Sequence, residues 1–317
     1  MPTAGFSILK TNNPQTTNMK HTFLLLLAAI IWGFAFVAQK AGMEFIGPFA
    51  FNGIRFALGA TSLLPLLLFQ KQLFSQSTGN SNKKFTIKGG ILLGVVLFVA
   101  ASLQQIGIVK STAGNAGFIT SFDIIIVLFL GVFIKHKISK EVWMGAFLAV
   151  VGLYLLSINK QFKMAPGDGL VLISALFWAI HILLIGHYAP KTNVLLLSVI
   201  QFTVSALLNL IAAAIFEEVR WSMVTGALYP ILYGGIMSIG VAYTLQVVGQ
   251  RNVAPSKAAI ILSFESVFAM MGGWMLLHET ITLKKGAGAL IMLLGLIVSQ
   301  LKLRPNRNKA REKTQTL

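Results

Sequence analysis

Long apolar runs alternate with short polar segments along most of the chain. Ten of these runs approach the length that a helix needs to cross a bilayer, about 20 residues. They lie at 22–41, 48–69, 89–109, 114–134, 141–158, 168–187, 193–216, 227–249, 255–277 and 286–302. Because backbone polar groups in lipid must be paired within their own segment, each run predicts a transmembrane helix. The pattern therefore predicts an all-α polytopic membrane protein.

Composition supports this fold class. Of the 317 residues, 56% are hydrophobic and 11% are charged, whereas a soluble domain carries about 25% charged residues. Such a chain cannot cover itself with a water-compatible surface, which argues against soluble enzymes and binding domains. The chain contains no cysteine, so disulfides, thiolate metal sites and redox chemistry at sulfur are excluded.

The basic residues predict the orientation of the chain in the membrane. There are 26 Lys and Arg against 9 Asp and Glu, and most of the basic residues fall in loops and tails. With the N-terminus inside, 17 of them lie on the inner side and 7 on the outer side. Because cytoplasmic loops are enriched in Lys and Arg, we expect both termini in the cytoplasm and no nucleic-acid partner. The expected tails are 1–21 and the basic segment 302–317, at a plasma (bacterial inner) membrane.

The chain also contains an internal repeat. Residues recur at an offset of 142 positions or, near the start of each half, of 146 positions. The matched pairs include Trp32 and Trp178, Arg55 and Gln201, Gln104 and Gln246, Asp123 and Glu265. Each half holds five predicted helices, and because five is odd the halves must enter the membrane from opposite sides. This predicts two inverted five-helix repeats, 22–158 and 168–301, an architecture typical of secondary transporters with a site near the midplane.

Short motifs in the two halves resemble a known family. They are Trp32-Gly33, Arg55-Phe56, Ala254-Pro255, Phe264-Glu265 and the stretch His278-Glu279-Thr280-Ile281-Thr282 leading to Gly288 and Gly295. With these motifs both halves resemble the EamA-like group of the drug/metabolite transporter superfamily. The resemblance implies ten helices and export of small metabolites, amino acids or drugs.

Two features depart from the family pattern. The family often has Glu-Pro in the middle of the fourth helix of each repeat, whereas this chain has Asp123-Ile124 and Glu265-Ser266. We therefore expect no proline kink in either helix. The family's glutamate after that helix is present as Glu279 and is replaced by Lys137 in the first half.

Two carboxylates are predicted in the middle of the bilayer. Asp123 lies about nine residues into its helix, or roughly 13 Å at the helical rise, and Glu265 lies about ten residues into its own from the opposite side. Charged side chains inside a membrane usually face a cavity or a partner. We expect one or both to line a transport cavity, where they bind a substrate amine or carry a coupling proton. The alternative is static charge pairing, in which Arg55 neutralises Asp123 and Lys257 lies on the helical face of Glu265.

Aromatic and amide side chains complete the predicted site. Trp32 and Trp178 fall in mid-helix rather than in the interfacial belt, and we expect them to form cavity walls. The walls would also include Phe118, Phe122 and Tyr243, with Gln104, Gln246 and Asn115 offering hydrogen bonds to a polar substrate. The alternatives are ordinary helix packing for the aromatic residues and interhelical hydrogen bonding for the amides.

No cofactor or metal is expected. His181 and His187 do not share a helical face, His278-Glu279 begins no HExxH motif, and no phosphate-binding GxxxxGK[ST] loop occurs. Glycines seven residues apart, Gly145 with Gly152 and Gly288 with Gly295, indicate helix-packing surfaces or a homodimer contact.

The leading hypothesis is a secondary active transporter, not an enzyme, that exports small organic metabolites by alternating access, with proton coupling left open. An uptake permease or exchanger of the same fold is the first alternative. A membrane-embedded lipid-modifying enzyme would need acids near an interface, and Glu217-Glu218 is the main cluster. If the protein is a transporter, we expect it to tolerate substitution of both glutamates. The fourth reading is a sensor or scaffold that moves no solute.

Overall fold

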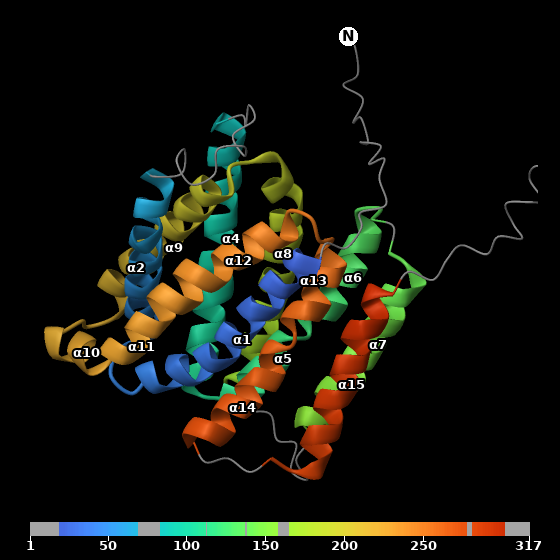
Figure 1. The fold of residues 1–317 in the computed structure, drawn as a ribbon. Coiled ribbons are helices and arrows are strands. Elements are labelled where there is room, and N and C mark those ends of the chain that lie inside the picture. Colours follow the sequence, from blue (N-terminus) through green and yellow to red (C-terminus); the bar gives the residue numbers. More distant parts are fainter. Residues whose placement is uncertain are drawn as a thin grey trace, which may run out of the picture.

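The computed structural model describes residues 19–68, 83–111, 113–136, 138–157, 165–277 and 281–301, all of whose regular elements are helices (Figure 1). Both termini extend beyond these ranges, so the tail expected at 302–317 and most of the one at 1–21 lie outside the described residues. So do four motif positions, Lys137, His278, Glu279 and Thr280.

The described helices follow the expected order. The first half contains α1 (Met19–Gly42), α2 (Pro48–Leu68), α4 (Lys83–Val109), α5 (Ala113–Thr120), α6 (Asp123–Phe133) and α7 (Lys140–Ser157). The second half contains α8 (Asp168–Tyr188), the 3₁₀ turn η1 (Ala189–Lys191), α9 (Val194–Phe216), α10 (Trp221–Gly226), α11 (Leu228–Leu232), the π-helix η2 (Tyr233–Tyr243), α12 (Thr244–Gln250), α13 (Pro255–Leu262), α14 (Glu265–Leu277) and α15 (Leu283–Gln300).

Nine segments within the described ranges are long and apolar enough to cross a membrane. Together they account for nine of the ten runs in the sequence. The remaining run, 141–158, corresponds to α7. An all-helical membrane fold is thus confirmed, while the count of ten spanning helices stays a prediction.

Two expected helices are interrupted at equivalent places in the repeat. The run 114–134 is divided after Thr120, and the run 255–277 is divided after Leu262. At each break the backbone tightens: the Phe122 N–H donates to the Ile119 carbonyl at 3.1 Å, and the Phe264 N–H donates to the Ile261 carbonyl at 3.3 Å. These bonds span three residues, as in a 3₁₀ turn. Neither helix has a proline at this point, as the sequence shows, and yet both helices are interrupted.

The run 227–249 also departs from the expected single helix. It contains an 11-residue π-helix, η2, between α11 and α12. A short additional helix, α10, precedes it and was not predicted. Apolar length alone cannot distinguish π from α winding, and six residues are too few for a periodic signal.

The contacts between helices α7 and α15 follow the two-fold symmetry of the repeat. They lie side by side at one edge of the bundle (Figure 1). A Cβ atom on Gly145 would meet the Gly295 carbonyl oxygen at 2.6 Å, and one on Gly152 would meet the Gly288 carbonyl oxygen at 2.5 Å. With one residue inserted near the end of the second half, the offset becomes 143, so Gly145 corresponds to Gly288 and Gly152 to Gly295. Gly145 therefore contacts the counterpart of Gly152, and Gly152 contacts the counterpart of Gly145. A two-fold axis between the helices generates this pattern, and the four glycines serve helix packing within one chain.

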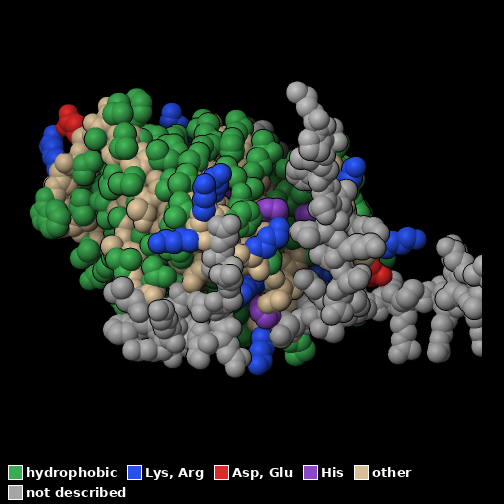
Figure 2. Space-filling view, turned by 90° about the horizontal axis from the view of Figure 1, so that it is seen from above, with side chains coloured by type: hydrophobic (Ala, Val, Ile, Leu, Met, Phe, Trp, Pro, Cys, Tyr) green, Lys and Arg blue, Asp and Glu red, His purple; other side chains and the backbone are tan. Residues whose placement is uncertain are grey.

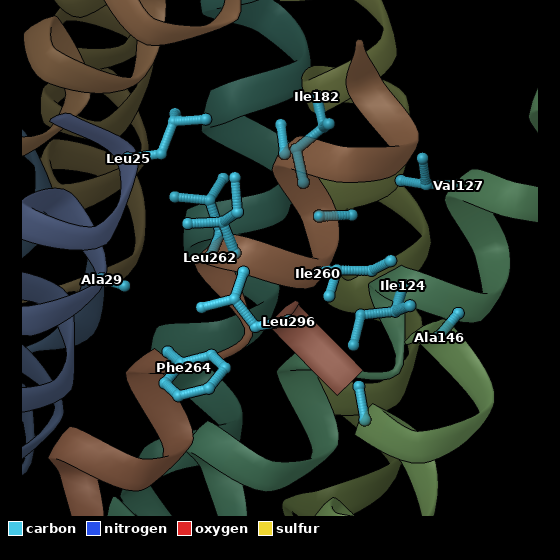
Figure 3. Packing of buried hydrophobic residues seen from close by; sticks show 14 of the residues in the cluster. Leu25, Ala29, Ile124, Val127, Ala146, Ile182, Ile260, Leu262, Phe264 and Leu296 are labelled. Atoms are coloured by element: carbon cyan, nitrogen blue, oxygen red, sulfur yellow. The ribbon is translucent and has the colours of Figure 1, made fainter. Parts of the chain in front are cut away.

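The interruption in the second half lies inside the packed core. Leu262 precedes it and Phe264 lies within it, and both are buried among apolar side chains from neighbouring helices (Figure 3). Ile124 and Ile182 belong to the same cluster and come from α6 and α8. The irregular backbone is therefore covered by protein rather than exposed to lipid, which is the condition under which membrane proteins tolerate it.

The close approach of α7 and α15 can be tested with Gly295→Ala. The added methyl group overlaps backbone of the facing helix, so we expect a destabilisation of about 1–3 kcal/mol, measured as a lower melting temperature in detergent. Gly286→Ala is the matched control, because a Cβ at Gly286 of the same helix meets nothing within 4 Å. Equal melting temperatures for the two variants would contradict the packing described here.

Candidate functional site

A cavity of about 50 Å³ lies between the two halves. This is room for a few water molecules. Its walls come from α1, α2, α4, α5 and α6 of the first half and from α8, η2, α12, α13 and α14 of the second. The lining residues are Trp32, Phe36, Gln39, Arg55, Gln104, Thr120, Asp123, Trp178, Ile182, Ser238, Tyr243, Gln246, Leu262 and Glu265.

Most of the lining residues form pairs related by the repeat. At offsets of 142 or 146 positions the pairs are Trp32 and Trp178, Phe36 and Ile182, Gln104 and Gln246, Thr120 and Leu262, Asp123 and Glu265. Equivalent positions of the two halves thus face the same space. The pseudo-two-fold axis between α7 and α15 relates the two sides of this cavity as well.

The two carboxylates lie where the helices are interrupted. Asp123 is the first residue of α6 and Glu265 is the first residue of α14. The two residues are 7% and 9% exposed, and both line the same cavity. Within the described structure, Asp123 Oδ1 has no hydrogen-bond partner. A carboxylate in the first helical turn is favoured by the helix dipole, and here it retains an acceptor for a ligand.

Arg55 is buried in the cavity wall and is held by its own helix. Its Nε donates to Asn52 Oδ1 at 2.9 Å, and its guanidinium lies 5.4 Å from the ring of Phe51 and 5.2 Å from that of Phe56. The ion pair with Asp123, given above as the alternative, is not observed among the described residues. Lys257 is half-buried on α13 and does not line the cavity.

Three aromatic side chains form a continuous wall. The Tyr243 ring lies edge-on to Trp32, with centroids 4.6 Å apart, and stacks on Trp178 at 6.1 Å. Trp32 is fixed by its Nε1, which donates to the Ser238 carbonyl oxygen at 3.2 Å. Such faces attract organic cations and amphipathic molecules.

The predicted amides behave differently from one another. Gln104 lines the cavity, and its Nε2 donates to Thr120 Oγ1 at 2.8 Å. Gln246 also lines the cavity, where its buried Oε1 is unpaired among the described residues. Asn115 is half-buried on α5 and does not reach the cavity.

The predicted aromatic pair of α5 is also placed elsewhere. Phe118 packs edge-on against Phe122 at 5.2 Å, and neither lines the cavity. Both side chains instead belong to the apolar cluster that contains Leu262 and Phe264.

Sequence reasoning missed several wall residues. They are Phe36, Gln39, Thr120, Ile182, Ser238 and Leu262. The repeat offset relates Phe36 to Ile182 and Thr120 to Leu262. Because neither member of either pair was a candidate, symmetry alone could not have found these four. A lone glutamine in an apolar helix was the available signal for Gln39.

A buried histidine supports the aromatic wall from behind. His181 is fully buried, its Nε2 lies 2.9 Å from Gln201 Oε1, and its ring lies edge-on to Trp178 at 6.0 Å. Gln201 is the repeat counterpart of Arg55, so the halves use this position differently. In the described part of the chain, no three His, Asp or Glu side chains gather as a metal site requires.

Two serines join the interrupted helices. The hydroxyl oxygens of Ser121 and Ser266 are 2.5 Å apart, and both also lie 3.0 Å from the Gly117 carbonyl oxygen. Ser263, the repeat counterpart of Ser121, instead donates to the Ile260 carbonyl of its own helix at 2.9 Å. Because Gly117 lies on α5 and Ser266 on α14, these contacts couple α5 of the first half to α14 of the second.

Glu217 has a structural contact that corrects the expectation for the acidic pair. Its two carboxylate oxygens accept hydrogen bonds from the backbone N–H groups of Phe49 and Ala50, each at 2.8 Å. Glu217 thus caps the start of α2, and its loss leaves these donors unsatisfied. Tolerance of substitution is expected only for Glu218, which is exposed and pairs with Arg220 at 3.1 Å.

Comparisons with known proteins agree with this architecture. The profile of a family described as the EamA-like transporter family matches residues 19–158 and 165–300. An uncharacterized transporter of Archaeoglobus fulgidus is 32% identical over 287 residues, which cover 88% of this chain and 85% of that protein. A probable amino-acid metabolite efflux pump of Salmonella typhimurium is 24% identical over 301 residues, covering 91% and 97% of the two chains.

A solved structure shares the fold. It bears the description "Crystal structure of protein", and it matches with a TM-score of 0.72 at 15% sequence identity. The match covers 89% of this chain and 96% of that chain. The likeness therefore extends over both halves.

The serine contact between the halves can be measured with a double-mutant cycle. We expect Ser121→Ala and Ser266→Ala to show a coupling energy of about 0.6 kcal/mol, the mean for hydrogen bonds between membrane helices. The measurement is the unfolding of the single and double variants in detergent. Ser263→Ala paired with Ser266→Ala is the control and should show no coupling. Additive effects of Ser121→Ala and Ser266→Ala would contradict the contact.

Proposed function

Because the chain belongs to the EamA-like transporter family and is an integral membrane protein, we propose that it is a secondary active transporter that exports small organic metabolites. The observation that carries the proposal is the cavity between the halves, with Asp123 and Glu265 at repeat-equivalent helix interruptions. Discontinuous helices that meet near the midplane are typical of substrate and ion sites in transporters with inverted repeats.

The size of the cavity supports a mechanism that requires movement of its walls. A volume of about 50 Å³ is too small for a molecule of many heavy atoms. Substrate entry therefore separates the halves at one side of the membrane, and release separates them at the other. A ligand shifts this equilibrium only through different affinities for the two states. Carboxylates shared by both halves provide such a difference, because each half contributes one ligand to the same substrate.

The chemistry of the walls favours an amine-bearing or amphipathic substrate. The carboxylates offer acceptors to an ammonium group, and the rings of Trp32, Trp178 and Tyr243 offer an apolar and cation-attracting face. Protonation of Asp123 or Glu265 provides a route for coupling to a proton gradient. The Salmonella relative bears the name "probable amino-acid metabolite efflux pump", which supports export over the alternative of uptake or exchange.

Other functions receive less support. A lipid-modifying enzyme would use acids near an interface, but Glu217 is occupied as a helix cap. The cavity is complete within one chain, so a homodimer is not required for the site. The small-molecule substrate and the lipid bilayer are the partners that the proposal needs.

We propose a bacterial inner membrane location with both termini in the cytoplasm. Lysines and arginines lie across the end of the bundle at which α1 begins (Figure 2). Exposed lysines of this end include Lys84 and Lys88 near the start of α4 and Lys191 after α8. Their position agrees with the rule that basic residues stay inside.

Substitution of the carboxylates tests the transport role. We expect Asp123→Asn and Glu265→Gln each to lower export by about 10- to 100-fold, the effect of losing a hydrogen bond to a charged group. The measurement compares metabolites in the medium of cells that overproduce each variant or the parent chain. Glu218→Gln is the control. Wild-type export with unchanged pH dependence in both variants would refute a role for either carboxylate.

Reporter fusions test the orientation. A reporter that is active only in the cytoplasm should be active at both the N-terminus and the C-terminus, because an even number of spans returns the chain to its starting side. Activity at one terminus alone would contradict both the orientation and the inverted repeat.

A further inference from the structure

The start of α2 is capped from the other half of the molecule. The backbone N–H groups of Phe49 and Ala50 donate to Glu217, which follows the last residue of α9. A Cβ atom at Gly47 would overlap the carboxyl group of Glu217, so the absence of a side chain there makes room for the contact. This cap exists only while the end of α9 stays beside the start of α2.

The equivalent helix of the second half caps itself. Asn193 corresponds to Gly47 in the repeat, and its side chain accepts from the Leu196 N–H at 3.0 Å. Leu196 is the counterpart of Ala50. The position equivalent to Glu217 is Lys71, a cation, which lies outside the described residues. A cap between the halves is therefore present at one end of the α2 and α9 pair, and the repeat supplies no matching carboxylate at the other.

This difference gives the two directions of opening unequal energies. Separating α2 from α9 at the Glu217 end leaves backbone donors of α2 unpaired, whereas separation at the opposite end leaves the cap of α9 intact. We propose that Glu217 is a latch between the halves, which closes the end of the molecule where α2 begins and disfavours opening there. In the proposed orientation this is the outer side. The inference rests on the proposed alternating-access function.

The latch can be tested without knowing the substrate. The chain contains no cysteine, so Ser238→Cys introduces a single thiol into the cavity wall, where Ser238 is 2% exposed. Its reaction with a membrane-impermeant maleimide reports opening to the side on which the reagent is added. Intact cells report the outer side, and inside-out vesicles report the inner side.

Two variants break the latch in different ways. Glu217→Gln removes the charge and one acceptor, while Gly47→Ala keeps the carboxylate and displaces it. In the Ser238→Cys chain we expect each to raise labelling from the outer side about tenfold, the effect of losing a helix cap, without raising labelling from the inner side. Glu218→Gln should label at the parent rate from both sides.

The possible outcomes separate the latch from the proposed function. If the Ser238→Cys chain is labelled from both sides and neither Glu217→Gln nor Gly47→Ala changes the rate, the latch is refuted while alternating access stands. An equal rise from both sides, or failure of both variants to fold, shows a purely structural cap and also overturns it. If the thiol of the parent chain reacts from neither side, alternating access fails and the latch fails with it.

Discussion

The interior of a bilayer supplies no partners for a carboxylate, so a charged group placed there must face protein or a cavity. This requirement applies once in each half, to Asp123 in the first and to Glu265 in the second. In the structure both helices are interrupted at the carboxylate, and both side chains are enclosed between the halves. The tight turns at the breaks pair the backbone locally, and the surrounding core separates them from lipid. The positions of Asp123 and Glu265 in the sequence thus determine where the cavity lies.

The two halves share the same helix arrangement and differ in the polar residues that the helices carry. Reciprocal glycine contacts and paired cavity residues preserve the two-fold relation. Divergence occurs at Arg55, which lines the cavity while its counterpart Gln201 contacts a histidine. Gly47 likewise depends on the opposite half for a cap. Under the proposed alternating access, such differences would give unequal energies to two states that perfect symmetry would make equal.

Much of this arrangement could be predicted from the sequence. Apolar runs located the helices, the odd number of spans in each repeat predicted their inversion, and the offset brought Asp123 and Glu265 to one site. The helix interruptions could not be predicted, because 3₁₀ tightening leaves no trace in hydropathy. The cap by Glu217 was missed since its partners lie 167 and 168 positions away, a separation that no local pattern reports.

The central claim is that the two halves move against each other around the shared cavity. Distances between spin labels test it directly, with one pair at Glu44 and Val219 near the start of α2 and another at Lys84 and Lys191 at the opposite end. The account predicts two distances for each pair, with one pair long when the other is short and the populations shifting with substrate or pH. A single unchanging distance at both ends would contradict it.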